Sequence, residues 1–92
     1  MPYIIETWDK PGSKAIRASA HPAHVDFLVA HARKLIFYCG AKLHGDGNLS
    51  GGIYVLDTED RREAETFLAT NPFTKAELFD RVTITCSQPS VM

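Results

Sequence analysis

The chain has 92 residues, of which 45% are hydrophobic, and ten basic residues against eleven acidic ones leave a net charge of −1. This size and composition predict a single globular domain over residues 1–92 and exclude an intrinsically disordered chain. No apolar run approaches the roughly 20 residues that span a bilayer, and no basic block with interleaved aromatic residues predicts nucleic-acid binding. The first residues carry no basic region followed by an apolar stretch, so we expect a cytoplasmic protein.

The first predicted elements are a strand and a helical region. Residues 3–8, YIIETW, are rich in β-branched and aromatic side chains, which is typical of a strand, and DKPGS follows as a turn. Because proline is favoured in the first turn of a helix, Pro22 predicts the start of the main helix, after a separate helical turn over residues 14–19. This helix is expected to end near Arg33. Its predicted core-facing stripe consists of Val25, Leu28, Val29 and Ala32.

The second half of the chain predicts a hairpin, a helix and a last strand. The hairpin strands are residues 35–43 and 52–57, and the glycine-rich segment HGDGNLSGG joins them. Asp57 or Thr58 is expected to cap the second helix, which ends before the segment NPF at residues 71–73, because a residue preceding proline is disfavoured in helical geometry. The segment ELFDRVTITCS then alternates as a closing strand, with Val82, Ile84 and Cys86 on one face.

The element order β-α-β-β-α-β predicts a ferredoxin-like α+β fold, an antiparallel sheet in spatial order 4-1-3-2 with both helices on one face. Apolar residues on both faces of the strands imply that the face away from the helices needs another cover. A second copy of the chain would supply it, so we expect a homodimer, a dimeric α+β barrel whose two sheets pack face to face. The residues expected on that outer face are Ile4, Ile36, Tyr38, Tyr54, Leu56 and Phe79.

Cysteine and histidine spacings do not indicate a metal site. Cys39 and Cys86 alternate with apolar residues and are interpreted as buried free thiols, on opposite edge strands and too far apart for a disulfide. His21 and His24 can reach one ion, with His44 as a third ligand. However, no HExxH pattern and no carboxylate at ligand spacing accompany them, so we expect no metal. The segment GDGN is predicted to be a turn and not a phosphate or calcium loop.

His24 is the candidate catalytic residue. If Pro22 is the first helical residue, His24 is the third, where the positive helix end disfavours imidazolium and keeps the ring neutral at pH 7. A neutral imidazole at the rim of an apolar pocket is suited to general-base catalysis. The residues alone favour the alternative, a histidine that only packs. Arg17, seven residues earlier, is either a bidentate ligand for a carboxylate in the same pocket or, more commonly, a solvated arginine.

The segments RASAHPAHVDFL and NPF flank a strand ending in Gly40, a strand led by Gly51 and Gly52, and a helix. In this order they resemble the YCII-related (YciI-like) family over nearly the whole chain. Members of that family resemble dimeric α+β barrel proteins, which include a muconolactone isomerase and a chlorohydroxymuconate dehydrochlorinase. The resemblance implies that His24 is the active-site histidine, paired in the family with an aspartate of an Asp-Pro-aromatic motif. This sequence has Asn71 in place of that aspartate, followed by Pro72 and Phe73.

Asn71 changes what the resemblance implies. Its amide can orient the His24 ring, but it brings no negative charge, so a weaker base or a binding site without turnover follows. An equal interpretation is that Asn71 only ends a helix ahead of proline. We expect His24 at the rim of an apolar pocket, within hydrogen-bond reach of Asn71 or one water away.

The implied function is a small enzyme of isomerase or lyase type, in which His24 transfers a proton on a small organic acid or lactone without metal or organic cofactor. In this hypothesis Asn71 orients His24, Arg17 binds an anionic group of the substrate, and Phe73 lines the pocket. The alternative is a non-catalytic ligand-binding or interaction dimer, which the Asn71 departure favours. A metal- or haem-dependent oxygenase of similar fold is a third possibility.

Overall fold

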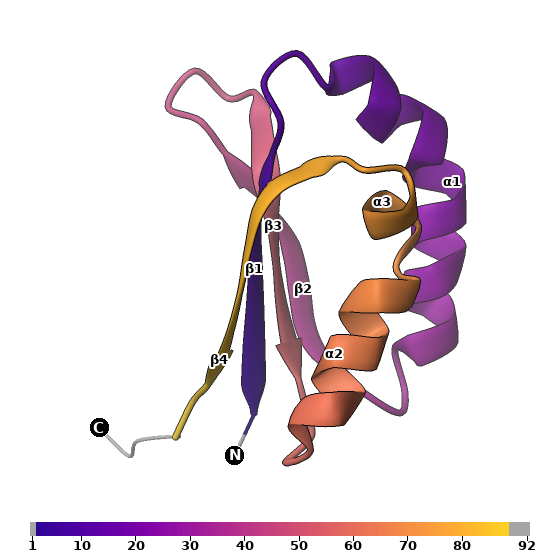
Figure 1. The fold of residues 1–92 in the computed structure, drawn as a ribbon, viewed down its shortest axis with the longest axis vertical. Helices are drawn as coiled ribbons and strands as arrows, with labels where there is room; N and C mark the ends of the chain where they lie inside the picture. The colour runs from indigo at the N-terminus through magenta and orange to yellow at the C-terminus, as the bar shows by residue number, and fades with distance from the viewer. Residues whose placement is uncertain (1, 89–92) are drawn as a thin grey trace.

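The computed structural model describes residues 2–88, and their elements confirm the predicted ferredoxin-like α+β fold. In chain order these are β1 (Tyr3–Asp9), α1 (Lys14–His31), β2 (Ile36–Leu43), β3 (Leu49–Leu56), α2 (Arg61–Thr70), α3 (Pro72–Lys75) and β4 (Phe79–Cys86). All three strand pairs are antiparallel, and the sheet order β2-β3-β1-β4 is the predicted order. The helices lie together on one face of the sheet, and no described element covers the other face (Figure 1).

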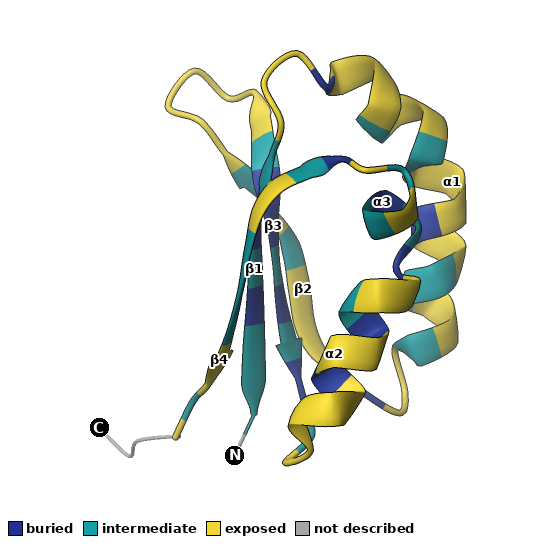
Figure 2. Ribbon diagram, viewed as in Figure 1, coloured by how far each residue is buried: buried dark blue, intermediate teal, exposed yellow. Residues whose placement is uncertain are grey.

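The core lies between the sheet and the helices. Ile5 pairs with Tyr54 and with Ile84, so these side chains point to the same, helix-covered face. The buried residues form dark bands along β1 and β3 and on the inner sides of the helices, whose outer sides are exposed (Figure 2). The hydrophobic core cluster consists of Ile5, Leu35, Tyr54, Leu56, Ala64 and Phe67.

The expected outer face is wrong at four of its six positions. Tyr54 and Leu56 are core residues, and Ile36 pairs with Leu56 on the same face. A register shift between Ile36 and Tyr38 explains the error on β2, because a bulge breaks the alternation and leaves Tyr38 on the opposite face from Ile36. The ring of Phe79 packs against Phe73 on the helix side.

The outer face has an apolar centre beside a charged end. Ile4 and Tyr38 both pair with Val55 there, from the two neighbouring strands, and Tyr38 is 57% exposed. At the charged end, Trp8 lies between Lys42, 3.6 Å from the ring centroid, and Arg81, 3.9 Å from it. This arrangement leaves a partly apolar sheet face that the described helices do not protect.

The first helix differs from its prediction in length and in the face that it buries. α1 runs unbroken through Pro22, which is exposed, so the carbonyl that loses its N–H partner there can bond to water. Val25 is 40% exposed and Val29 is 71% exposed. The side that faces the sheet and α2 instead carries the residues His24, Phe27, Leu28 and His31.

The later helices follow from their capping residues. α2 begins at Arg61, later than predicted, because Asp60 and not Asp57 or Thr58 is the N-cap and accepts a hydrogen bond from the Arg62 N–H. It ends before Pro72, as predicted. The short helix α3 was not predicted, although Asn71 as N-cap with Pro72 at the first position is a helix-start signal.

The remaining expectations concern the hairpin loop and the thiols. The GDGN segment is a turn, closed by hydrogen bonds from the His44 N–H to the Asn48 carbonyl and within Asp46–Asn48. Cys39 and Cys86 are free, on the two edge strands as predicted, but both are exposed and not buried. None of the helices within residues 2–88 is long and apolar enough to cross a membrane.

Candidate functional site

The interior between α1 and the sheet contains a histidine–tyrosine pair. His24 is only 7% exposed, and its Nε2 lies 2.9 Å from the hydroxyl oxygen of Tyr54 on β3. The two rings meet edge to face, with centroids 6.0 Å apart. A buried polar pair of this kind satisfies both groups, and it places a titratable ring beside a hydroxyl in a site largely closed to water.

The backbone of β3 makes room for the tyrosine. Gly52 lies two residues before Tyr54 on the same face, and a Cβ at Gly52 would meet both the Tyr54 ring and its hydroxyl at 3.4 Å. The Tyr54 ring therefore lies over Gly52. On the neighbouring strand the Thr7 hydroxyl oxygen accepts a hydrogen bond from the Gly52 N–H at 2.9 Å. This close contact between β1 and β3 fixes the strand that carries Tyr54.

Both members of the pair are neutral at pH 7. Burial, followed by the charges of Arg17 and His21, lowers the pKa of His24 to about 4. Burial raises the pKa of Tyr54 to about 12, although the Asn71 side chain and Arg17 act in the opposite direction. The sequence correctly predicted a neutral His24, but for the wrong reason. The predicted cause was the positive end of the helix, whereas His24 lies well inside α1, which starts at Lys14.

The helix α3 closes the site from the other side. The Phe73 ring stacks on the His24 ring, with centroids 3.8 Å apart and planes inclined by 15°. Asn71 is fully buried, and its Oδ1 accepts a hydrogen bond from the Phe73 N–H at 2.9 Å. Asn71 thereby holds Phe73 in place as the N-cap of α3. The expected direct bond between Asn71 and His24 is not among the hydrogen bonds of residues 2–88, and Nε2 of His24 is paired with the Tyr54 hydroxyl instead.

Arg17 lies beside the same aromatic ring but has an internal partner. Its guanidinium carbon is 4.9 Å from the centroid of Phe73. Arg17 Nε donates to Asp9 Oδ2 at 2.8 Å, and Nη2 donates to Asp9 Oδ1 at 3.3 Å and to the Gly51 carbonyl at 3.1 Å. The guanidinium edge expected to hold a substrate carboxylate is thus occupied by Asp9. A ligand anion at this position has to displace Asp9 or approach the guanidinium from another side.

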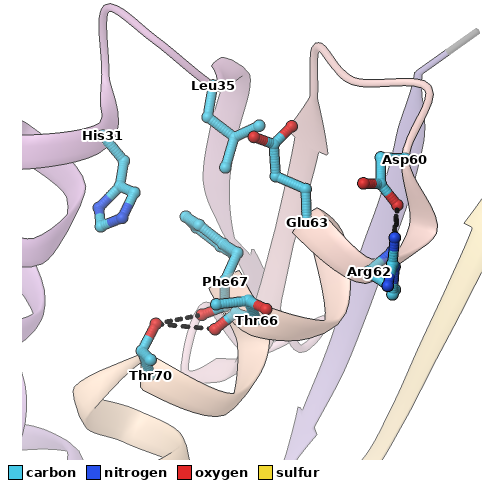
Figure 3. A pocket seen from close by; sticks show the side chains of 8 residues that line it. All are labelled: His31, Leu35, Asp60, Arg62, Glu63, Thr66, Phe67 and Thr70. Carbon is cyan, nitrogen blue, oxygen red and sulfur yellow. Dashed lines mark hydrogen bonds and ion pairs between the residues drawn. The ribbon is translucent and has the colours of Figure 1, made fainter.

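Two cavities flank this interior. One, of about 800 Å³, lies between the turn that follows β1 and the β2–β3 loop, and its lining includes Asp9, Arg17 and His44. The other, of about 520 Å³, lies between the end of α1 and α2, where His31, Glu63 and Phe67 face it (Figure 3). Neither of these two cavities is lined by His24. Phe73 connects His24 to Arg17 and hence to the larger cavity.

The residues considered as metal ligands do not come together. His21 is exposed, whereas the neighbouring His24 is buried and engaged by Tyr54, and His44 lines the larger cavity. Within residues 2–88 no group of three or more histidine, cysteine or acidic side chains is arranged to hold a metal ion.

The sequence reasoning missed two members of the site, Tyr54 and Asp9. The GGIY pattern was a signal for Tyr54, because a small residue two positions earlier on a strand leaves space on the same face for a large ring. Asp9 had no comparable signal, because the approach of the β1 end to α1 is a property of the folded chain.

The fold and the buried histidine–tyrosine pair define a ferredoxin-like α+β protein with a polar site enclosed between its helices and its sheet. The model of the YCII-related domain matches residues 1–87, so the chain belongs to the YCII-related family. No curated protein sequence matches this chain.

Solved structures extend the comparison. The 5-chloro-2-hydroxyhydroquinone dehydrochlorinase TftG from Burkholderia phenoliruptrix AC1100, in complex with 2,5-dihydroxybenzoquinone, is 26% identical with a TM-score of 0.89, over 98% of this chain and 96% of that one. Rv0793 from Mycobacterium tuberculosis is 14% identical with a TM-score of 0.58, over 99% and 97% of the two chains. An antibiotic biosynthesis monooxygenase is also 14% identical, with a TM-score of 0.54 over 96% and 98%. The last two likenesses show the fold alone.

Proposed function

We propose that this protein is a small-molecule enzyme of lyase or isomerase type in which His24 transfers a proton, without a metal or an organic cofactor. The observation that carries the proposal is the neutral His24 ring, 2.9 Å from the Tyr54 hydroxyl and nearly closed to water. A buried pair with proton-donor and proton-acceptor capacity is the minimum needed to move a proton on a bound ligand.

The dehydrochlorinase TftG suggests the ligand class. It is similar to this chain over nearly the full length of both and was solved with a dihydroxybenzoquinone. Loss of HCl from a chlorinated hydroxyquinol breaks one C–Cl bond and two O–H bonds. One proton leaves with chloride and the other forms a C–H bond at the carbon that lost chlorine, which gives a hydroxyquinone without an oxidant. We therefore propose small, oxygen-rich ring compounds or organic acids as substrates. In this proposal Arg17 contributes positive charge, Phe73 forms the wall, and Asn71 holds that wall in place.

The site also supports a second candidate, a non-catalytic ligand-binding dimer. The specific observation in its favour is that Phe73 and Tyr54 already cover the His24 ring, while the larger cavity is lined by Arg17 and not by His24. A ligand held in that cavity would sense the charge of Arg17 and Asp9 without meeting a catalytic group.

Chloride release from 5-chloro-2-hydroxyhydroquinone tests the proposal, together with binding of 2,5-dihydroxybenzoquinone measured by calorimetry. We expect the wild-type protein to release chloride and His24→Gln to be slower by about 100- to 10,000-fold, the usual contribution of a general acid or base. His21→Gln is the matched control, because His21 is an exposed histidine one turn away, and we expect its rate to stay within about twofold.

The outcomes separate the two candidates. Undiminished chloride release by His24→Gln would contradict a catalytic His24. Tight binding of the quinone without turnover, equal in the wild-type protein and in His24→Gln, would support the ligand-binding alternative. Absence of both binding and turnover in the wild-type protein would contradict the proposed ligand class.

A further inference from the structure

The cavity between the end of α1 and α2 contains a histidine whose tautomer is fixed by the backbone. His31 Nδ1 lies 2.8 Å from the carbonyl oxygen of Phe27, one turn earlier on α1. A carbonyl oxygen can only accept a hydrogen bond, so Nδ1 carries the proton of the neutral ring and Nε2 carries the lone pair. The two nitrogens point in divergent directions, so Nε2 is directed away from that carbonyl. It has no hydrogen-bond partner within residues 2–88.

Two phenylalanine rings hold the His31 ring in this orientation. The Phe27 ring lies 4.2 Å away between centroids, and the ring of Phe67 on α2 meets His31 edge to face at 5.5 Å. Phe67 is buried and His31 is half-buried, and both line the cavity of about 520 Å³ (Figure 3). Nε2 is therefore a preoriented hydrogen-bond acceptor at a cavity whose size suits a small molecule.

Other polar groups around this cavity are also left as acceptors. The Thr70 hydroxyl donates its proton to the carbonyl oxygen of Thr66 at 2.8 Å (Figure 3), so only its oxygen lone pairs remain for a ligand. The Glu63 carboxylate lines the same cavity and has no ion-pair partner within residues 2–88. A carboxylate has no proton to donate. The hydrogen-bond donors of a ligand would therefore find acceptors on both helices.

The charges of the lining favour a cation. Glu63 and Asp60 are the two carboxylates of the lining, and Arg62 is its one permanently charged cation. Asp60 Oδ1 accepts a hydrogen bond from the Arg62 N–H at 2.9 Å, which leaves Oδ2 for another donor. The Arg62 guanidinium is largely exposed, 4.0 Å from Asp60, and does not pair with Glu63. Glu63 is thus an uncompensated negative charge beside the His31 acceptor, and an anionic ligand is disfavoured here.

We propose that this cavity binds a small primary amine in its protonated form, whose ammonium group donates to His31 Nε2 and to the Glu63 carboxylate. An ammonium group carries three donors and no acceptor, which complements this lining. Leu35 and Phe67 offer an apolar wall to the body of the ligand. The site does not depend on the proposed function, because His24 and Tyr54 do not line this cavity.

Three probes that share one ring test the ligand class: benzylamine, benzyl alcohol and benzoate. Each is titrated near pH 8 into the ¹⁵N-labelled protein, and long-range ¹H–¹⁵N spectra follow the histidine side chains. We expect saturable binding of benzylamine, a shift of the His31 Nε2 signal, and an unchanged His24. Benzyl alcohol, which lacks the charge, should bind about fivefold more weakly or worse, since hydrogen bonds to charged groups are the stronger ones. Benzoate should not bind.

Glu63→Gln and Glu65→Gln are a matched pair of variants. Both remove one negative charge from an exposed position of α2, but Glu65 does not line the cavity and lies 3.8 Å from Arg61. We expect Glu63→Gln to weaken benzylamine binding by about fivefold or more, and Glu65→Gln to leave it within about twofold. His31→Phe keeps an aromatic ring and removes the acceptor, so it should weaken binding as well. If that variant does not fold, the two glutamate variants still decide.

Several results would overturn the proposal. These are the absence of saturable benzylamine binding up to about 10 mM, equal affinities of Glu63→Gln and Glu65→Gln, and a shift at His24 with none at His31. Benzyl alcohol or benzoate binding as tightly as benzylamine would exclude an ammonium ligand. Because these titrations need no turnover, failure of the proposed function would be seen separately, in the chloride assay.

Discussion

His24 on α1 and Tyr54 on β3 are joined by a hydrogen bond of 2.9 Å between Nε2 and the hydroxyl oxygen. The bond connects the helical layer to the centre of the sheet, and Phe73 stacks on the free face of the histidine ring. Two helices and one strand, distant in sequence, therefore converge on one buried imidazole. Stability, protonation and the proposed chemistry all depend on this contact.

The buried neutral histidine predicts a loss of stability in acid. Its pKa is lowered from 6.5 to about 4 in the folded protein, so between these pH values the unfolded chain binds more protons and acidification favours unfolding. The full effect is about 3 kcal/mol, reached near pH 4 and absent above pH 7. Urea unfolding of the wild-type protein and of His24→Gln from pH 7.5 to 4 measures it. Equal losses in the two proteins would refute this linkage.

The glycine pair at residues 51 and 52 predicts opposite tolerance to alanine. A Cβ at Gly51 would run into the backbone carbonyl oxygen of Thr7, whereas a Cβ at Gly52 makes ordinary contacts with Thr7 and Tyr54. We expect Gly51→Ala to lower the free energy of unfolding by about 1–3 kcal/mol or more, since backbone must move. Gly52→Ala should change it by less than about 1 kcal/mol. Equal denaturation midpoints for the two variants would contradict the close approach of β1 and β3.

The unprotected sheet face predicts a homodimer. Ile4, Val55 and Tyr38 lie on this face, and packing against a second copy should bury more than roughly 1,000 Å² in total. Light scattering at micromolar concentration should give twice the chain mass of 10.2 kDa. Val55→Lys should give the monomer mass, whereas Val29→Lys, on the 71% exposed outer side of α1, should not. A wild-type mass near that of one chain would exclude this dimer.

The cysteines predict two reactive thiols. Cys39 and Cys86 are exposed and free, on opposite edge strands. A thiol reagent added to the folded protein without reductant should therefore modify two groups per chain. Detection of an intramolecular Cys39–Cys86 bond would be incompatible with the observed strand order, because edge strands of this sheet are separated by two others.

Fold class and strand order were predictable because they depend on a few strong patterns. Alternation marked the strands, and turn residues such as Gly47 and Pro11 marked their ends. It was less predictable which side of each strand and helix faces the core. The bulge at residues 36–38 reversed part of β2, and Val25 and Val29 fitted a helical stripe that the folded chain exposes. Aromatic contacts of His24 with Phe73 and of His31 with Phe67 decided which side of α1 is buried.

The sequence predicted most residues of the candidate site but not the contacts between them. His24, Arg17 and Phe73 lie together, with Asn71 beneath Phe73. The sequence could not show that Tyr54 pairs with His24, or that Asp9 is the partner of Arg17, because both contacts depend on how the strands and α1 come together in the folded chain. Burial, which sets the pKa of His24, is likewise a property of the packed structure.

The central claim, that His24 is a buried neutral imidazole in a site that Asn71 and Phe73 close, is tested most directly by an NMR titration of the His24 ring protons. The wild-type protein should titrate near pH 4, and Asn71→Asp should titrate at clearly higher pH, because a nearby carboxylate stabilises imidazolium. A wild-type midpoint at the ordinary value of 6.5, or the same midpoint in both proteins, would contradict the claim.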